Sequence, residues 1–243
     1  RVRDLMSTFS HRSVLLDECI EALAIRQGGV YIDGTAGGGG HSGEIAKRLK
    51  NGMLISIDRD PEAIANLTRR FNGVECVRLV HNNFFNLKDI LSEMGIDAVD
   101  GVLADLGVSS HQLDEPSRGF SFHNEAPLDM RMSLEGMSAE QAVNTLSQAE
   151  LRKIIYDYGE EKFAPSIAKA IVAAREIAPI KTTLELSEII KSAMPAAARR
   201  DGHPARRTFQ AIRIYVNGEL EGLDTAVHNM FDCLRPGGRV SVI

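Results

Sequence analysis

The sequence predicts an α/β protein built on a doubly wound parallel sheet, with a mainly helical domain inserted into it. Two observations predict the sheet. Short apolar runs alternate with helix-like segments over the first 106 residues, and a glycine-rich loop follows the first of those runs. A third observation predicts the insertion, because strand-like runs stop after Leu106 and helical patterns dominate from 138 to 192.

The first part of the chain supplies the strands in order. Ser13 precedes an apolar stripe at helical spacing, so we expect it to be the N-cap of the first helix. The predicted strands are 30–33, 53–58, 74–80 and 101–106, and the predicted helices after the first are 44–49, 62–71 and 87–94. Strands joined by helical crossovers run parallel, which predicts the doubly wound sheet.

The end of the chain returns to this pattern. A helix is predicted over 209–234, a turn at 235–238 and a strand over 239–243. We therefore expect residues 1–108 and 209–243 to form the α/β domain, and residues 109–208 to form the inserted helical domain.

Composition and charge place the chain among ordinary folded proteins. Hydrophobic residues make up 44% of the 243 positions, charged residues make up 25%, and the net charge is −5. Cys19, Cys76 and Cys233 are widely separated and form no CxxC motif, so neither a metal site nor a disulfide framework is expected. No apolar run approaches the roughly 18 residues of a membrane span, and we expect a cytoplasmic protein without membrane contact.

The glycine loop from Asp33 to Gly43 stands between a strand and a helix, where a backbone can approach a bound nucleotide closely. Two interpretations compete. Gly38, Gly40 and Gly43 fit the G-x-G-x-x-G pattern of dinucleotide enzymes, in which Asp58 at the end of the second strand would hold ribose hydroxyls.

The alternative ligand is S-adenosylmethionine. In that case Asp33 orients its amino-acid end, the loop at Gly38 covers it, Asp58 again holds the ribose and Phe84 offers a face to the adenine. Each residue also has a purely structural interpretation. Asp33 caps the turn, Asp58 belongs to a helix-start signal and Phe84 lies in the core.

Asp105 ends the fourth predicted strand and is followed by Leu106 and Gly107. In a methyl-transfer fold, a carboxylate at this position faces the gap between donor and acceptor. An ordinary cap is the alternative.

A set of short motifs occurs in order along nearly the whole chain. They are His11–Glu18, Tyr31–Thr35, Gly38–Ser42, Ile57–Pro61, Asp105–Ser110, Arg118–Phe122, Pro127–Met132 and Arg207–Ala211. Taken together, these motifs resemble those of the MraW (RsmH) family of bacterial 16S rRNA cytosine-N4 methyltransferases. This set is more specific than a glycine fingerprint and favours the methyl donor over the dinucleotide.

The resemblance implies a Rossmann-like class I methyltransferase domain that contacts S-adenosylmethionine. The implied contacts are Gly39, Gly40, His41, Asp58, Phe84, Asp105 and Gln112. It implies the cytidine at position 1402 of 16S rRNA, in the small ribosomal subunit, as substrate, with the inserted domain receiving the base. Family members continue beyond the segment matching Arg239–Ile243, so we expect a sheet that lacks its last strands.

The conjugated exocyclic amine of cytosine is a poor nucleophile, and a hydrogen-bond acceptor on its hydrogens stabilises the charge that develops there. Asp105 is the candidate acceptor, although it could instead orient the donor. Transfer to nitrogen requires no covalent adduct, so no cysteine nucleophile is expected.

Three groups in the insertion are candidates for RNA contact. Asp129 and Arg131 either position the base or pair with each other. Phe120 and Phe122 either stack on a flipped base or lie in the core. Arg206 and Arg207 belong to a basic cluster that suits phosphates or is simply solvated. Its other members are Arg199, Arg200 and Arg213, with His203 nearby and Asp201 as the only acid within the stretch.

Two other function classes remain open from the residues alone. One is an NAD-linked dehydrogenase that uses the same glycine loop. The other is a non-catalytic RNA-binding or ribosome-assembly factor that retains a cofactor pocket.

Overall fold

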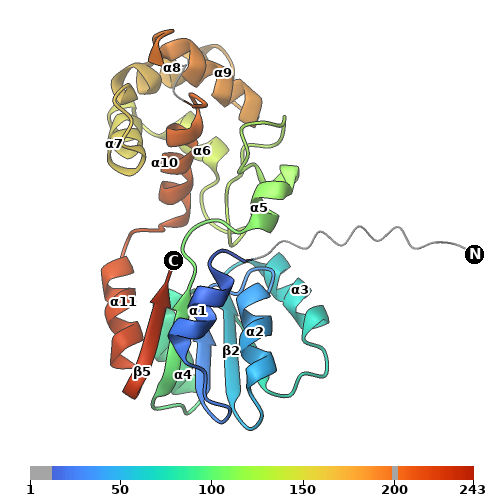
Figure 1. Ribbon diagram of the computed structural model, residues 1–243. Coiled ribbons are helices and arrows are strands. Elements are labelled where there is room, and N and C mark those ends of the chain that lie inside the picture. Colours follow the sequence, from blue (N-terminus) through green and yellow to red (C-terminus); the bar gives the residue numbers. More distant parts are fainter. Residues whose placement is uncertain (1–12, 199–201) are drawn as a thin grey trace, which may run out of the picture. The chain divides into compact units, whose positions relative to one another are not determined.

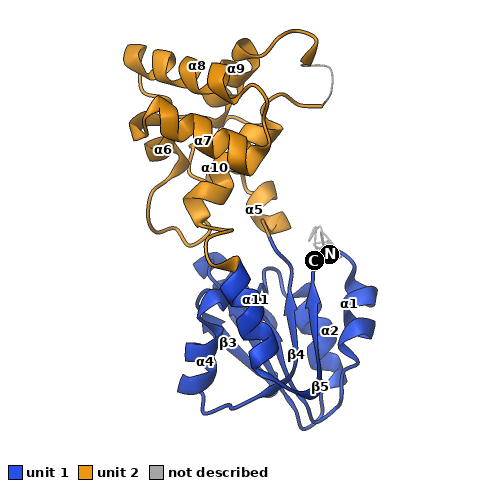
Figure 2. Ribbon diagram, turned by 90° about the vertical axis from the view of Figure 1, so that its left-hand side faces the viewer, with its two compact units in different colours: residues 1–106, 224–243 blue, residues 107–223 orange. Residues whose placement is uncertain are grey.

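The computed structural model describes residues 13–198 and 202–243, which divide into two compact units (Figures 1 and 2). Unit 1 contains the described residues up to Leu106 together with Asp224–Ile243. Unit 2 contains Gly107–Leu223, less the three residues outside the description.

Unit 1 is built on a five-stranded sheet in the order β3-β2-β1-β4-β5, with every pair parallel. The strands are β1 (Val30–Asp33), β2 (Met53–Asp58), β3 (Val77–His81), β4 (Val99–Ala104) and β5 (Leu234–Val242). The predicted doubly wound parallel sheet is confirmed.

Helices cover both faces of this sheet (Figure 1). Helices α1 (Leu16–Leu23) and α2 (Gly40–Arg48) share one apolar cluster with Tyr31, while α4 (Leu87–Glu93) and α11 (Leu223–Asp232) share another with Ile32. Helix α3 (Pro61–Arg70) packs along β3. Neighbouring residues of β1 therefore point to opposite faces and both are buried, as expected for a parallel sheet covered on two sides.

Ser13 does not cap α1. The helix begins at Leu16 after Leu15, which adopts a left-handed conformation with φ 46°, and no side chain caps it. Ser13 instead lies against the glycine loop, because a Cβ built on Gly40 would stand only 1.9 Å from the Ser13 Oγ. The residues before α1 thus contact the loop that was expected to hold the ligand.

The predicted turn at 235–238 lies inside β5. Leu234 pairs with Val99 and Arg239 pairs with Gly101, so four residues of β5 stand opposite one position of β4 as a bulge. Within the described chain, β3 and β5 are the edges of the sheet.

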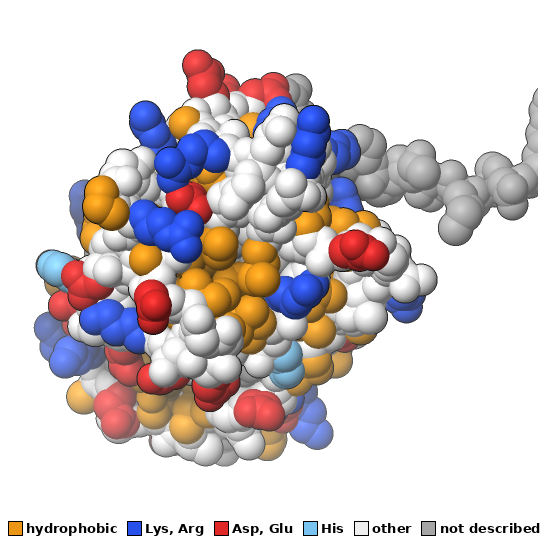
Figure 3. Space-filling view, turned by 90° about the horizontal axis from the view of Figure 1, so that it is seen from below, with side chains coloured by type: hydrophobic (Ala, Val, Ile, Leu, Met, Phe, Trp, Pro, Cys, Tyr) orange, Lys and Arg blue, Asp and Glu red, His pale blue; other side chains and the backbone are white. Residues whose placement is uncertain are grey.

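At the end of unit 1 where the strands begin, the buried Asp100 joins three segments. It accepts hydrogen bonds from the Val30 amide at 2.7 Å, from Arg235 at 3.3 Å and from Arg26. Figure 3 views the structure from this end and shows hydrophobic side chains gathered in the middle of the face, with charged side chains around them.

Unit 2 is helical, as predicted for the insertion. Its helices are α5 (Ser110–Asp114), η2 (Pro116–Arg118), α6 (Ala139–Thr145), α7 (Gln148–Gly159), α8 (Ala164–Ile177), α9 (Thr183–Ala193) and α10 (Arg206–Asn217). Ser109, Ser138, Ser147 and Thr182 begin four of these helices with capping boxes, which satisfy the first free amides of each helix.

The boundaries of the two units differ from those predicted. We expected the α/β domain to resume at residue 209, but α10 belongs to unit 2, which extends to Leu223. Phe209, Ala211 and Ile212 of α10 are buried in the core of unit 2, and the helix packs against α7. An amphipathic pattern reveals a helix, whereas only the packed partner shows which core the helix joins.

Among the residues described, none of the helices combines the length and the apolar character required to cross a bilayer.

Candidate functional site

Three carboxylates stand at the carboxyl ends of three neighbouring strands in unit 1. Asp33 ends β1, Asp58 ends β2, and Asp105 follows β4. The chain changes its direction of winding between β1 and β4, and ligands of open α/β sheets bind beyond the strand ends at such a switch point. Burial raises the pKa of all three carboxyl groups above the ordinary value.

The loop after β1 is fastened to the strand on either side. On the β4 side, the Gly34 amide donates to the Leu103 carbonyl at 2.8 Å, and the Asp105 amide donates to Thr35 Oγ1 at 2.6 Å. On the β2 side, the Ala36 amide donates to the Ile57 carbonyl at 2.9 Å. These bonds fix the backbone of the loop and of Asp105 together.

Asp33 is fully buried beneath the loop. Its carboxylate accepts a hydrogen bond from the Ser42 hydroxyl at 2.6 Å and one from the Thr35 amide at 3.3 Å. Because the Ser42 proton goes to Asp33, the Ser56 hydroxyl is the donor in the 2.8 Å bond between the two serines. Any effect of Asp33 on a bound donor must therefore pass through the loop that it holds.

Asp58 is half-buried and held at both oxygens. The Gly37 amide donates to Oδ2 at 2.7 Å, and the Asp60 amide donates to Oδ1 at 2.8 Å. Burial raises the pKa of Asp58, and the two amides oppose that rise. Because a carboxylate offers about four acceptor positions, Asp58 retains capacity for the hydroxyls of a ribose.

Asp105 is half-buried, and no described residue donates a hydrogen bond to its carboxylate. Burial raises its pKa, while His41 nearby opposes the rise. Thr35 fixes the backbone of Asp105, while the carboxylate oxygens of Asp105 remain able to accept a hydrogen bond from a ligand.

The glycines of the loop differ in their surroundings. A Cβ on Gly39, whose φ is 78°, would lie 2.7 Å from Leu67, and a Cβ on Gly34 would lie 3.1 Å from Phe84. At Gly38 a Cβ would meet nothing within 4 Å. The loop is therefore packed from beneath at Gly34 and Gly39 and has open space at Gly38, an arrangement that fits a ligand lying against its backbone.

His41 is buried in the first turn of α2. Its Nε2 donates to the Val14 carbonyl at 3.1 Å, which fixes the proton on that nitrogen in the neutral ring. His41 thus joins the segment before α1 to the glycine loop.

Phe84 begins the short η1 (Phe84–Asn86) after β3. Its ring is partly buried, lies against Gly34 and meets Phe85 edge to face at 4.8 Å. Phe84 therefore lies against the glycine loop. This position agrees with a core residue and also with a residue that contacts adenine.

Gln112 lies in unit 2, in α5. It is buried, and its side-chain oxygen accepts a hydrogen bond from the Ser109 amide at 3.0 Å as part of the capping box. Its proposed contact with the donor remains a prediction.

The two phenylalanines predicted to receive a base have different environments in unit 2. Phe120 is buried in the core, so the core interpretation is correct for its side chain. Phe122 is partly buried and already stacks on His203, with ring centroids 4.2 Å apart and an interplanar angle of 19°.

Asp129 and Arg131 pair with each other. Arg131 donates from Nε at 3.0 Å and from Nη2 at 2.7 Å, one bond to each carboxylate oxygen. Burial acts to raise the pKa of Asp129, but the hydrogen bonds from Arg131 outweigh it and leave the pKa below its ordinary value. The ion-pair alternative is therefore the one realised in the structure.

The basic cluster is smaller than the sequence suggested. Arg213 is paired with Glu219 through two bonds of 2.8 and 2.9 Å, so Asp201 is not the only acid to consider. Arg206 and Arg207 are exposed at the start of α10, and Arg207 donates to the Glu160 carbonyl at 3.0 Å. Arg199, Arg200 and Asp201 lie outside the described residues.

Sequence reasoning missed two residues that hold the segment 127–132. The buried Arg118 donates to the carbonyls of Arg131 and Met132 at 2.9 and 3.1 Å. The buried Asn217 donates to the Met130 carbonyl at 2.7 Å and accepts from the Met132 amide at 2.8 Å. An asparagine before a glycine at a helix end resembles a simple helix stop, so its sequence gave no sign of this role.

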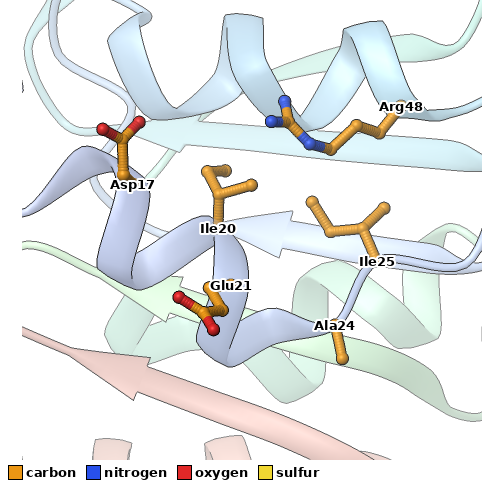
Figure 4. Close-up of a pocket in the computed structure, with 6 residues that line it drawn as sticks. All are labelled: Asp17, Ile20, Glu21, Ala24, Ile25 and Arg48. Atoms are coloured by element: carbon orange, nitrogen blue, oxygen red, sulfur yellow. The ribbon is translucent and has the colours of Figure 1, made fainter.

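Other parts of the structure offer less chemistry. A surface hollow of about 370 Å³ beside α1 (Figure 4) contains none of the predicted site residues. It is lined by Asp17, Ile20, Glu21, Ala24, Ile25 and Arg48. The described residues include no group of three potential metal ligands. Burial raises the pKa of the Cys233 thiol to about 11, which keeps it protonated and unreactive.

Comparison with known proteins assigns the family. Residues 8–243 match the model of the MraW methylase family. The "Ribosomal RNA small subunit methyltransferase H" of Clostridium botulinum (strain Kyoto / Type A2) is 54% identical over 237 residues, which are 97% of this chain and 77% of that protein. The protein with the same name from Ruminiclostridium cellulolyticum is 52% identical over 241 residues, with the same coverage.

Among solved structures, an rRNA methylase from Streptococcus thermophilus aligns with 39% of this chain and 49% of its own, at 20% identity and a TM-score of 0.32. The fold assignment rests on the strand order and register of unit 1. The family match, which covers nearly the whole chain, separates the methyl-donor interpretation of the glycine loop from the dinucleotide one. The chain belongs to the MraW methylase family, whose members are methyltransferases that depend on S-adenosylmethionine.

Proposed function

We propose that the protein transfers a methyl group from S-adenosylmethionine to the exocyclic N4 amine of the cytidine at position 1402 of 16S rRNA, in the small ribosomal subunit. Membership of a methylase family supports the transfer, and the names of the relatives support small-subunit rRNA as the substrate. A protein that acts on this substrate works in the cytoplasm.

Residues of unit 1 hold the donor in this proposal. S-adenosylmethionine supplies an electrophilic methyl group when it is bound. The loop at Gly38, Gly39 and Gly40 lies against the donor, with the open space at Gly38 as supporting observation. Asp58 accepts hydrogen bonds from the ribose hydroxyls, and Phe84 contacts the adenine.

The remaining donor contacts are indirect or come from unit 2. His41 and Asp33 hold the loop in shape from beneath, through Val14 and Ser42. Gln112 contributes from α5, as the family resemblance implies.

Asp105 carries the cytosine-N4 proposal. Its half-buried carboxylate stands at the switch point with no hydrogen-bond donor among the described residues, so it can accept a hydrogen bond from the target amine. Such a bond opposes conjugation of the nitrogen lone pair with the ring and stabilises positive charge as the new bond forms.

Unit 2 receives the RNA in this proposal. Arg206 and Arg207 are exposed at the start of α10 and suit phosphate contacts. The Asp129–Arg131 pair and Phe122 shape the surface near the base, and the buried Phe120 supports it from the core.

The test is to incubate the protein with isotopically labelled S-adenosylmethionine and small subunits isolated without this modification, and then to map the labelled nucleotide by mass spectrometry. We expect one label per subunit, on the N4 amine of cytidine 1402. Label on a ring carbon, or on another nucleotide, would contradict the proposal.

The same assay decides between catalysis and a purely binding role. Subunits that are bound without uptake of label would indicate an assembly factor with a retained donor pocket. Isothermal titration of the protein with S-adenosylmethionine and with NAD, run in parallel, tests the donor site itself, and preference for NAD would refute the proposed cofactor.

A further inference from the structure

Four aromatic rings from two distant segments of unit 2 form a continuous group, which we call the aromatic stack: Phe122, His123, His203 and Phe209. Phe209 is buried in the core and meets Phe122 edge to face, with centroids 5.5 Å apart. Phe122 then stacks on the half-buried His203. The exposed His123 is tilted by 52° against Phe122, with centroids 4.4 Å apart, and meets His203 edge to face at 5.4 Å and 68°. The stack therefore begins in the core and ends at the surface in two imidazoles.

His203 is held in one orientation and one tautomer. Its Nδ1 accepts a hydrogen bond from the Ala205 amide at 3.2 Å, so the neutral ring carries its proton on Nε2. Burial lowers the pKa of His203, and electrostatic repulsion from His123, Lys191 and Arg206 lowers it further, while Glu188 opposes them. At neutral pH, His203 is a flat uncharged ring with a donor at its edge.

The charges around the stack are mostly positive. Arg206 is exposed on α10, while Lys191 on α9 is exposed and paired with Glu188 at 3.0 Å. An aromatic ring beside an arginine is a combination with which proteins bind unpaired nucleotides, because the base stacks on the ring and the phosphate meets the cation. The two imidazoles make no cation site, since the described residues supply no third ligand there.

We propose that His203, stacked on Phe122, and His123, set edge-on beside it, form a platform on which an unpaired nucleotide of the RNA substrate packs, with Arg206 contacting its phosphate. This inference rests on the proposed function. It also changes the role predicted for Phe122, which supports the platform and does not itself contact the base.

The test is equilibrium binding of the full chain to unmethylated small ribosomal subunits without methyl donor, measured by filter retention. His203→Ala is expected to bind about tenfold more weakly, a loss typical of one stacked base. His203→Phe keeps the flat ring and should retain most of the affinity. Arg206→Ala should weaken binding and reduce the salt dependence of the affinity by about one phosphate contact.

One control and one further variant keep the result decisive. His228→Ala, the control, removes an exposed histidine in unit 1, whose Nδ1 donates a hydrogen bond to the Asp224 carbonyl at 2.7 Å, and should bind as the wild type does. His123→Ala alters an exposed ring without disturbing the core, so it tests the platform if His203→Ala impairs folding. Unchanged affinity of folded His203→Ala, or of His123→Ala where the former does not fold, overturns the platform.

Different experimental results would overturn the platform and the proposed function. A wild type that methylates cytidine 1402 while the histidine variants bind normally overturns only the platform. A wild type that binds subunits but transfers no methyl group contradicts the proposed function, while a tenfold loss in His203→Ala would still support the platform. A wild type that does not bind subunits overturns both.

Discussion

The backbone amide of Gly37 donates a 2.7 Å hydrogen bond to the carboxylate of Asp58, and so fastens the loop after β1 to the end of β2. The Asp60 amide holds the other carboxylate oxygen at 2.8 Å. The side chain proposed to hold the donor's ribose is thus fixed before any ligand arrives, which lowers the entropy that binding must spend on ordering it.

Asp58→Ala should weaken the binding of S-adenosylmethionine by about 1.5 to 3 kcal/mol, since hydrogen bonds to a charged group are lost. Isothermal titration measures the affinity. Asp58→Asn keeps one acceptor oxygen for the backbone amides, so its donor affinity should fall between those of the wild type and Asp58→Ala. Glu44→Ala, which removes a carboxylate paired only with Lys47 and Arg48 on α2, is the control. Equal affinities of Asp58→Ala and the wild type would contradict the ribose role.

Gly38→Ala and Gly40→Ala should act differently, although the two glycines are two positions apart. Space is open at Gly38, so its alanine variant should fold normally but bind the donor more weakly. At Gly40 a Cβ would lie 1.9 Å from the Ser13 Oγ and 3.2 Å from the Ser13 Cβ, so that variant should lose some stability without ligand even when the Ser13 hydroxyl rotates away. Ser13→Gly should restore part of that stability. Thermal unfolding and donor titration separate the effects, and equal unfolding temperatures for both alanine variants would be the opposing result.

Asp105→Asn should lower kcat by about 10²- to 10³-fold, with little change in donor affinity. The neutral amide oxygen accepts a hydrogen bond from the target amine more weakly than a carboxylate does, and it does not offset the positive charge that develops on the nitrogen. Burial raises the pKa of Asp105, so the wild-type rate should fall on acidification at a pH above the ordinary aspartate range. The variant should lack this acid limb. A pH profile of single-turnover methyl transfer provides the measurement, and an unchanged acid limb in the variant would exclude Asp105 as the titrating acceptor.

The contribution of Asp33 to the free energy of unfolding of the ligand-free protein should decrease as the pH rises. Burial raises the pKa of Asp33 above 3.8, so the folded state binds this proton more tightly than the unfolded chain does. The free energy of unfolding then falls as the pH rises from the unfolded pKa through the raised folded one. Asp33→Asn keeps an oxygen for Ser42 but does not titrate. Urea unfolding of both proteins across this range should show a pH-dependent difference; a constant difference would rule out the raised pKa.

Asp100→Ala should lower the free energy of unfolding by about 1 to 3 kcal/mol, mainly because the partly buried Val30 amide loses its acceptor. The paired arginines are largely exposed and add little. Asp100→Asn keeps an acceptor and should lose less. Asp232→Ala breaks an exposed pair with Lys88 and should change the stability little. Similar losses for Asp100→Ala and Asp232→Ala in chemical denaturation would argue against the buried acceptor.

Local patterns determined most of what the sequence predicted correctly. The apolar runs that became β1, β2 and β4 are buried on both faces, and such runs read as strands whatever lies beside them. The acidic residues at the strand ends and the glycines after β1 also predict a ligand site locally, because parallel strands bring their carboxyl ends to one edge.

Only the tertiary structure decided which residues pair and which core each helix joins. The pairing of Arg213 with Glu219, the packing of α10 in unit 2 and the contact of Ser13 with Gly40 each replaced an expectation drawn from neighbours in sequence. The aromatic stack likewise brings His123 against His203, which is 80 positions away in the sequence (123 to 203). Strand and helix preferences arise from interactions within a few residues, whereas burial, charge pairing and pKa depend on groups that approach only when the chain is folded.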